Sequence, residues 1–240
     1  MLLAAAAVLA GAVLQSATGF GFSLVAAPLV FAAVGPPEAV GAMIVLGLAV
    51  NLLTLFTEGR SPRPLARDSA MLLGWAVPGA LAGVAVLRSL DAVALQVAVS
   101  VGVVATLAAR RLAAGRHVPR WAASLAGFAS GGLTTSTTTS GPPLLVYLLG
   151  RPADPEQVRD TLTVCFVGLV PISVAALWVT GTDDAVPEAD LILVCLPLVV
   201  IGHLLGRPVF AHLARGHRYE PVLTGVLLAA VVGGLLSATL

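Results

Sequence analysis

The sequence has very little charge. Only 10% of its 240 residues are charged and none is lysine, whereas 58% are hydrophobic. Because soluble globular domains carry about 25% charged residues, this composition excludes an ordinary soluble domain and indicates a membrane protein. The formal net charge of +1 does not bear on nucleic-acid binding, but the arginines form no basic stripe, so we expect no nucleic-acid partner.

Disulfide-forming and metal-binding residues are equally scarce. The two cysteines, Cys165 and Cys195, both lie inside apolar runs, where a cysteine is typically a small buried hydrophobic residue. Four histidines without a spaced cluster provide no metal motif. The sequence therefore predicts no disulfide, no metal site and no cofactor.

Long apolar runs dominate the chain instead. Each is about 16–23 residues long, close to the ~20 residues that a helix needs to cross the hydrocarbon core. The runs are Glu38–Thr57, Ala70–Leu87, Ala92–Ala109, Gln157–Val179, Leu191–Gly206 and Pro221–Leu240. The apolar N-terminus is also typical of a cleaved signal peptide. It has no basic start and continues into further apolar sequence, so we interpret it as part of the membrane domain.

Two further apolar stretches are interrupted by polar residues. Met1–Val34 is broken at Gln15–Ser23, and Trp121–Gly150 is broken at Thr134–Pro143. The arms are too short to cross alone: the first pair, of about 14 and 11 residues, would measure ~21 and ~17 Å. Each stretch predicts a re-entrant helical hairpin whose tip stops inside the membrane. The predicted fold class is an all-α polytopic membrane protein with eight hydrophobic helical units.

The polar loops differ in charge. Arginines are concentrated in Glu58–Asp68, Arg110–Arg120 and Arg207–Glu220, whereas Gly181–Asp190 has none. The positive-inside rule therefore places the three basic loops on the cytoplasmic side of the cell (cytoplasmic or inner) membrane. Counting crossings from these loops, the first hairpin enters from outside and the second from the cytoplasm.

The two halves of the chain have similar patterns. A Pro-x4-Gly-x4-Arg pattern begins at Pro78 and recurs from Pro197, an offset of 119 residues. Each half contains a broken hairpin followed by three spans, and three spans invert the second half relative to the first. We predict one transmembrane transporter domain, 1–240, with inverted repeats at 1–110 and 118–240, as in many secondary transporters.

The breaks contain the groups that bind an anion. Irregular backbone at membrane depth is kept only where it lines a cavity or is buried in protein. Glycines allow a tight turn, hydroxyls can cap the freed amides, and helices that begin at the breaks direct their positive ends to the membrane centre. The alternative is that the hydroxyls bond only the preceding carbonyl groups of their own helices.

We assign the substrate site to both breaks and one arginine. The assigned residues are Gln15, Ser16, Thr18, Gly19, Gly21, Ser23, Thr137, Thr138, Thr139, Ser140, Gly141 and Arg159. Arg159 has two interpretations: an ion pair with Asp160 or Glu156, or contact with the anion at the cytoplasmic mouth.

Two more polar residues lie deep in apolar sequence. Asn51 either lines the substrate path or bonds a neighbouring helix. His203 is titratable and lies inside a span, which favours proton coupling. It also lies close to Arg207, which favours a role at the membrane interface.

At the two breaks the sequence resembles the TauE/SafE family of sulfite exporter-like membrane proteins. LQSATGFGFSLVAAPLVFAAVGPPEAVGAM is similar to the family's first glycine-rich motif and its following proline, here Pro28. GFASGGLTTSTTTSGPPLLVYLL is similar to the second-half motif, and RDT at 159–161 and GHLLG at 202–206 resemble two later ones. This chain has threonines where the second motif is often richer in glycine.

The resemblance implies export or exchange of sulfite, an organosulfonate or a related small sulfur oxyanion, and no enzymatic activity. The implied partners are the small anion and the lipid bilayer, with protons as a candidate coupling ion and a homodimer as a candidate assembly. Two alternatives remain. One is a passive anion channel, and the other is an intramembrane hydrolase that pairs Ser140 with His203.

Overall fold

The computed structural model describes residues 2–57, 59, 61–91, 94, 118–182 and 187–215. Within these ranges the chain forms helices and no strands, which confirms the predicted all-α class. The helices are α1 (Leu2–Thr18), α2 (Phe22–Val34), α3 (Pro36–Thr57), α4 (Ala66–Ser89), α6 (Ala122–Thr137), α7 (Gly141–Leu149), α8 (Pro155–Val179) and α9 (Ala189–Arg215).

Four of the described helices are long and apolar enough to cross a membrane. They contain the candidate spans Glu38–Thr57, Ala66–Ser89, Pro155–Val179 and Ala189–Val209. The large apolar side chains on their outer faces are exposed, as for Trp178, which is 79% exposed; lipid tails would cover these faces. The two other predicted spans, Ala92–Ala109 and Pro221–Leu240, lie outside the described residues apart from Ala94.

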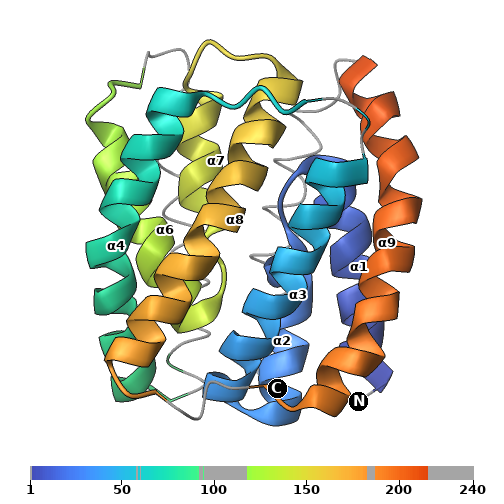
Figure 1. Ribbon diagram of the computed structural model, residues 1–240, viewed down its shortest axis with the longest axis vertical. Helices are drawn as coiled ribbons and strands as arrows, with labels where there is room; N and C mark the ends of the chain where they lie inside the picture. Colours follow the sequence, from blue (N-terminus) through green and yellow to red (C-terminus); the bar gives the residue numbers. More distant parts are fainter. Residues whose placement is uncertain are drawn as a thin grey trace.

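The structure contains two broken hairpins. The arms of the first are α1 and α2, and the arms of the second are α6 and α7. α1 starts at the lower end of the bundle in Figure 1 and α2 returns to that end, whereas α6 and α7 start and finish toward the upper end. The two hairpins thus enter the bundle from opposite ends, with the relative orientation that the loop charges predicted.

Both breaks are narrower than the sequence predicted. The helices stop only over 19–21 and 138–140, so the polar residues Gln15–Thr18 and Thr134–Thr137 are helical. Their hydroxyls explain the difference, because Thr18, Thr134 and their neighbours donate to carbonyl groups one turn back. Such bonds hold the hydroxyls inside the helix rather than at its cap.

Glycines allow two helix pairs to pack closely. α4 packs on α6, where a side-chain methyl at Gly83 would collide with the Gly132 carbonyl. α9 packs on α1, where a methyl at Gly202 would come within 2.7 Å of the Leu9 carbonyl oxygen. Small residues at helix crossings are typical of membrane bundles. Each half thus packs a long span against the first hairpin arm of the other half. The inverted repeat itself stays a prediction.

The buried apolar residues divide along the same lines. One cluster joins α4, α6, α7 and α8, a second joins α1, α2, α3 and α9, and a smaller one lies between α3, α4 and α8. Cys165 and Cys195 are buried free thiols in the first two clusters, which confirms their prediction as small apolar residues. Phe20 of the first break belongs to the first cluster, and Phe22, just after that break, belongs to the second.

Candidate functional site

A cavity lies where the two breaks face each other. Its volume is about 60 Å³, twice the roughly 30 Å³ that one water molecule occupies in the liquid. Its walls come from both breaks and from the central helices α3 and α8. The lining residues are Gln15, Gly21, Phe22, Ser23, Leu24, Met43, Ile44, Gly47, Leu48, Asn51, Thr134, Thr138, Thr139, Ser140, Gly141, Phe166, Leu169 and Val170.

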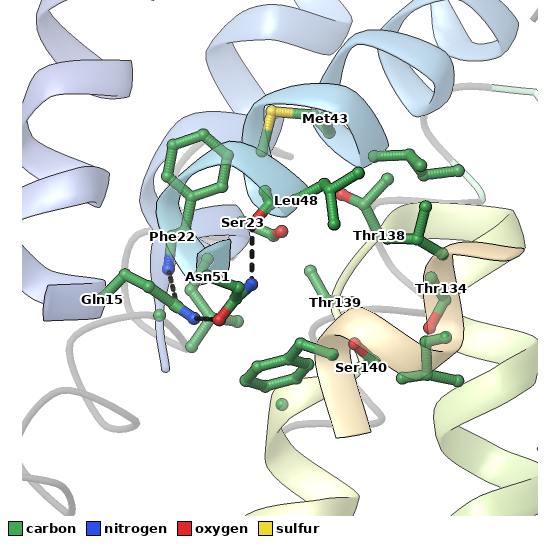
Figure 2. Close-up of a pocket in the computed structure, with 18 residues that line it drawn as sticks. Gln15, Phe22, Ser23, Met43, Leu48, Asn51, Thr134, Thr138, Thr139 and Ser140 are labelled. Atoms are coloured by element: carbon green, nitrogen blue, oxygen red, sulfur yellow. Dashed lines mark hydrogen bonds between the residues drawn. The ribbon is translucent and has the colours of Figure 1, made fainter. Parts of the chain in front are cut away.

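The first wall contains a chain of hydrogen bonds through two amides. Gln15 Oε1 accepts the backbone N–H of Phe22 at 3.1 Å, and Gln15 Nε2 donates to Asn51 Oδ1 at 3.0 Å. Asn51 Nδ2 then donates to the Gly47 carbonyl at 2.7 Å. Figure 2 shows these bonds on one side of the cavity, opposite Thr134, Thr138, Thr139 and Ser140. The chain ties the end of α1 to the start of α2 and to the middle of α3.

The second wall is the threonine run at the end of α6. Most of its hydroxyls donate to carbonyls of the preceding turn, as Thr134 does to Ser130 at 2.6 Å and Thr137 to Leu133 at 3.0 Å. Thr138 differs: its hydroxyl is buried and has no hydrogen-bond partner among the described residues. Its backbone is left-handed, with φ 60°. No other non-glycine residue in the described ranges has a positive φ.

Two helices begin at the cavity. α2 starts after Gly21 and α7 after Ser140, and neither of these N-cap residues makes a side-chain capping bond. The Thr18 hydroxyl accepts the Phe20 amide at 3.4 Å, so a hydroxyl caps an amide inside the first break as predicted, but neither N-cap residue caps its helix. Gln15 rather than a hydroxyl accepts the first amide of α2.

In α2 the amides of Ser23 and Leu24 have no acceptor within their own helix. In α7 Pro142 and Pro143 have no N–H, so Gly141 provides the amide at the helix start. These amides, together with the helix dipoles, favour an anion.

The structure brings eight of the predicted polar and glycine positions to the cavity and leaves the others outside. Those at the cavity are Gln15, Gly21, Ser23, Asn51, Thr138, Thr139, Ser140 and Gly141. Those outside its lining are Ser16, Thr18, Gly19, Thr137, Arg159 and His203. Two of the residues outside the lining, Arg159 and His203, contact Ser16 near the end of α1, next to the first break.

Arg159 is one of these two residues. It is 1% exposed, and its guanidinium donates to the Ser16 carbonyl at the end of α1 at 2.7 Å. A cation at a helix C-terminus is favourable because of the helix dipole. Its aliphatic part packs under Gly19, where a Cβ atom would come within 2.7 Å of Arg159 Cγ. The neighbouring Asp160 accepts the backbone N–H of Arg63 at 2.7 Å.

His203 is also buried, and both of its ring nitrogens have hydroxyl partners. Nδ1 lies 2.9 Å from Ser16 Oγ and Nε2 lies 2.7 Å from Thr57 Oγ1. Thr57 Oγ1 also lies 2.7 Å from the Leu53 carbonyl oxygen. A Thr57 proton donated to that carbonyl requires the tautomer with hydrogen on Nε2, in which Nδ1 accepts from Ser16. Because both nitrogens are used in this way, His203 does not pair with Ser140, and the Ser140–His203 hydrolase has no support in this geometry.

Most of the lining residues that the sequence did not predict are apolar. The exception is Thr134, the first residue of the polar run. Met43 and Gly47 precede Asn51 at intervals of four residues, so the face of α3 that bears Asn51 could have been found from helical spacing. Phe166, Leu169 and Val170 of α8 give no such signal, because they are apolar residues in an apolar helix. The lining contains no charged side chain.

The described part of the chain contains no candidate metal site. No group of three His, Cys, Asp or Glu side chains within it could hold an ion. A small ligand in the cavity would therefore meet amides, hydroxyls and apolar groups alone. Uncharged donors at helix starts bind anions in this way.

Fold and site together define a class: a polytopic helical membrane protein whose two broken hairpins meet at an uncharged polar cavity. The profile of one protein family, described as Sulfite exporter TauE/SafE, matches residues 3–234. The chain therefore belongs to the TauE/SafE family and is a multi-pass membrane protein of the sulfite-exporter type, a transporter rather than an enzyme. No curated protein and no solved structure matches the chain.

Proposed function

We propose that the protein is a secondary transporter that exports sulfite, an organosulfonate or a related small sulfur oxyanion across the cytoplasmic membrane. The observation that carries this proposal is the buried Thr138 hydroxyl, which lacks a partner at the cavity between the two breaks. Leaving such a group unpaired costs about 1–3 kcal/mol. A ligand oxygen would remove that penalty.

The surroundings of Thr138 favour an anion over other ligands. The first turns of α2 and α7 both border the cavity through Phe22, Ser23 and Gly141. Their amides and dipoles attract negative charge, and the lining provides no acidic side chain to oppose it. The small volume fits an ion the size of a few heavy atoms.

Transport requires access from each side in turn. In transporters built from inverted repeats, one repeat moves against the other around a fixed central site. The hairpins of this chain enter from opposite ends and both border the cavity, which supports the same motion. Opening beside one hairpin would connect the cavity to one side of the membrane and opening beside the other would connect it to the opposite side.

Protons are the coupling ion that we propose, with His203 as the group that carries them. In the neutral ring Nδ1 accepts from Ser16, and protonation would require Ser16 to accept instead. Ser16 also provides the carbonyl that Arg159 bonds. A change in the charge of His203 would thus act directly on the helix end that borders the first break.

The deciding experiment is a flux assay with purified protein in liposomes. Sulfite, sulfate, thiosulfate and short sulfonates would be tested with and without an imposed pH gradient. A carrier is expected to show saturable flux, stimulation by anion on the opposite side, and uphill movement driven by the gradient. Unsaturable downhill flux would establish the passive channel instead. Flux no greater than in protein-free liposomes for all these anions would refute the proposed function.

A further inference from the structure

The hydroxyl groups of the threonine run are not equivalent as hydrogen-bond donors. From 134 to 137, each hydroxyl donates its only proton to a backbone carbonyl; the acceptors are Ser130, Ala80, Gly132 and Leu133 respectively. Thr139 is paired with Thr137, 2.8 Å away. Because the Thr137 proton goes to Leu133, Thr139 is the donor in that pair. The Thr138 proton is left for a ligand.

Ser140 is the other residue of the run that can donate into the cavity. It precedes α7 and lines the cavity, and its side chain makes no capping bond to the helix that it starts. Thr134 and Thr139 also line the cavity, but their protons are already donated. The second wall therefore offers two hydroxyl donors rather than a continuous row.

In the first wall, the orientation of the Gln15 and Asn51 amide groups is fixed by the backbone groups at the two ends of their hydrogen-bond chain. A backbone N–H can only donate, so the Phe22 amide requires the oxygen of the Gln15 side chain. Gln15 must then present its NH₂ group to Asn51, which uses the Asn51 oxygen. At the other end a backbone carbonyl can only accept, so Gly47 requires the Asn51 NH₂ group. Both ends thus impose the same orientation on the two amides.

This orientation decides what Asn51 presents to the cavity. Its oxygen is occupied by Gln15, and one of its two amide hydrogens is occupied by Gly47. The second amide hydrogen remains, and Asn51 lines the cavity. Both walls therefore present side-chain hydrogens that no acceptor among the described residues uses. The first wall offers the second amide hydrogen of Asn51, and the second wall offers the hydroxyls of Thr138 and Ser140.

We infer that the ligand is bound by a donor set that includes Thr138, Ser140 and Asn51, and that the other threonines of the run, whose protons are already donated within the protein, do not bind it. This inference rests on the proposed function and identifies the ligand as an oxyanion that accepts hydrogen bonds on two opposite faces. Gln15 is a positioning residue, since it acts by orienting Asn51.

A comparison of neighbouring threonines tests the inference. Thr138→Val removes a free donor, whereas Thr134→Val removes a hydroxyl from the same wall whose proton is already donated. Binding of sodium sulfite to the purified protein and the KM for sulfite flux in liposomes would be measured for both. Thr138→Val is expected to weaken binding and raise KM about tenfold or more, as for a lost hydrogen bond to a charged group. Thr134→Val is expected to raise KM by a clearly smaller factor than Thr138→Val, because the Thr134 proton is already donated to Ser130.

A second pair tests the amide. Asn51→Leu removes the donor without adding charge and is expected to weaken sulfite binding about tenfold. Asn51→Asp places an acceptor and a negative charge at the same position and is expected to abolish binding. A monodisperse size-exclusion profile for each variant shows that it has folded. If Asn51→Asp does not fold, Asn51→Leu and the two threonine variants still test the inference.

The outcomes separate this inference from the proposed function. Equal losses in Thr134→Val and Thr138→Val, or sulfite binding by folded Asn51→Asp equal to that of the unaltered protein, would overturn the donor set. Sulfite binding with the expected variant pattern but without flux would support the donor set and refute the transporter. Absence of both binding and flux in the unaltered protein would refute both.

Discussion

Thr138 has a backbone conformation that threonine rarely adopts. Its φ of 60° is left-handed, which costs on the order of 1–3 kcal/mol in a residue with a branched Cβ. At the 119-residue offset of the predicted repeat, the position in the first break that corresponds to Thr138 is Gly19, with φ 87°. The second break thus keeps a strained side chain where the first has glycine.

The first prediction separates stability from binding at this residue. Thr138→Gly relieves the strain but removes the free hydroxyl. We expect the unfolding temperature in detergent to stay equal or rise, because glycine adopts positive φ readily, while KM for sulfite rises about tenfold. Thermal unfolding and liposome flux would be measured on the same preparation. A marked fall in unfolding temperature would contradict the strain argument.

Gly19 carries the second prediction. Gly19→Ala would place a methyl group at φ 87° and against Arg159 Cγ. We expect a loss of stability on the order of 2 kcal/mol from the backbone and the collision together. Gly74→Ala is the matched control, because a Cβ atom at Gly74 of α4 would meet nothing within 4 Å. Equal thermal unfolding of the two variants would contradict this packing.

Residue types alone pointed to several of these positions. The sequence predicted a role for Thr138, Ser140 and Asn51 because polar residues are expensive in a membrane. It could not predict which hydroxyls donate away from the cavity, because the acceptor of Thr135 depends on how α6 lies against α4. The Thr135 hydroxyl bonds Ala80 of α4, 55 residues away.

At the scale of elements, α7 is too short to be stable alone. It has nine residues, whereas isolated helices shorter than about 12–15 residues are marginal even in favourable sequences. Its far end is held by Tyr147, which donates a hydrogen bond to Asp68 in the first turn of α4. Arg151, just beyond α7, pairs with the same carboxylate at 3.4 Å. The returning arm of the second hairpin is thus anchored to α4.

The third prediction concerns this anchor. Tyr147→Phe removes the hydrogen bond and leaves the buried Asp68 with fewer partners, which we expect to cost about 1–3 kcal/mol of stability. The start of α7 borders the cavity, so sulfite flux is expected to fall as well. Thermal unfolding and flux would be compared with Phe166→Leu, which alters the cavity wall without touching the anchor. Unchanged stability in Tyr147→Phe would show that the anchor is dispensable.

The elements were predicted better than their ends. Apolar length identified the long spans, and the polar interruptions identified both hairpins. The sequence pattern puts the ends of α1 and α6 too early, because runs of serine and threonine are more typical of caps and turns than of helix interiors. In this chain Ser136 and Thr137 continue α6 by bonding carbonyls one turn back, an alternative that sequence alone leaves open.

At the scale of the whole molecule, polar contacts join the two halves behind the cavity. Arg159 of α8 reaches the end of α1, and His203 of α9 bonds both Ser16 of α1 and Thr57 of α3. The sequence identified Arg159 and His203 as unusual because both are ionisable residues in apolar runs. It could not identify their partners, because these are distant in the sequence. Ser16 is 143 residues from Arg159 and 187 residues from His203.

The fourth prediction tests whether His203 couples transport to protons. His203→Gln retains a donor toward Thr57 and an acceptor toward Ser16, as in the neutral ring with hydrogen on Nε2, but it cannot titrate. The described charged side chains that act on His203 are Arg207 and Arg159, and both stay in the variant. We expect downhill exchange of sulfite to persist in liposomes while uphill movement driven by a pH gradient is lost. Gradient-driven accumulation in His203→Gln equal to that of the unaltered protein would exclude His203 as the proton carrier, and loss of downhill exchange as well would indicate that the residue holds α1, α3 and α9 together instead.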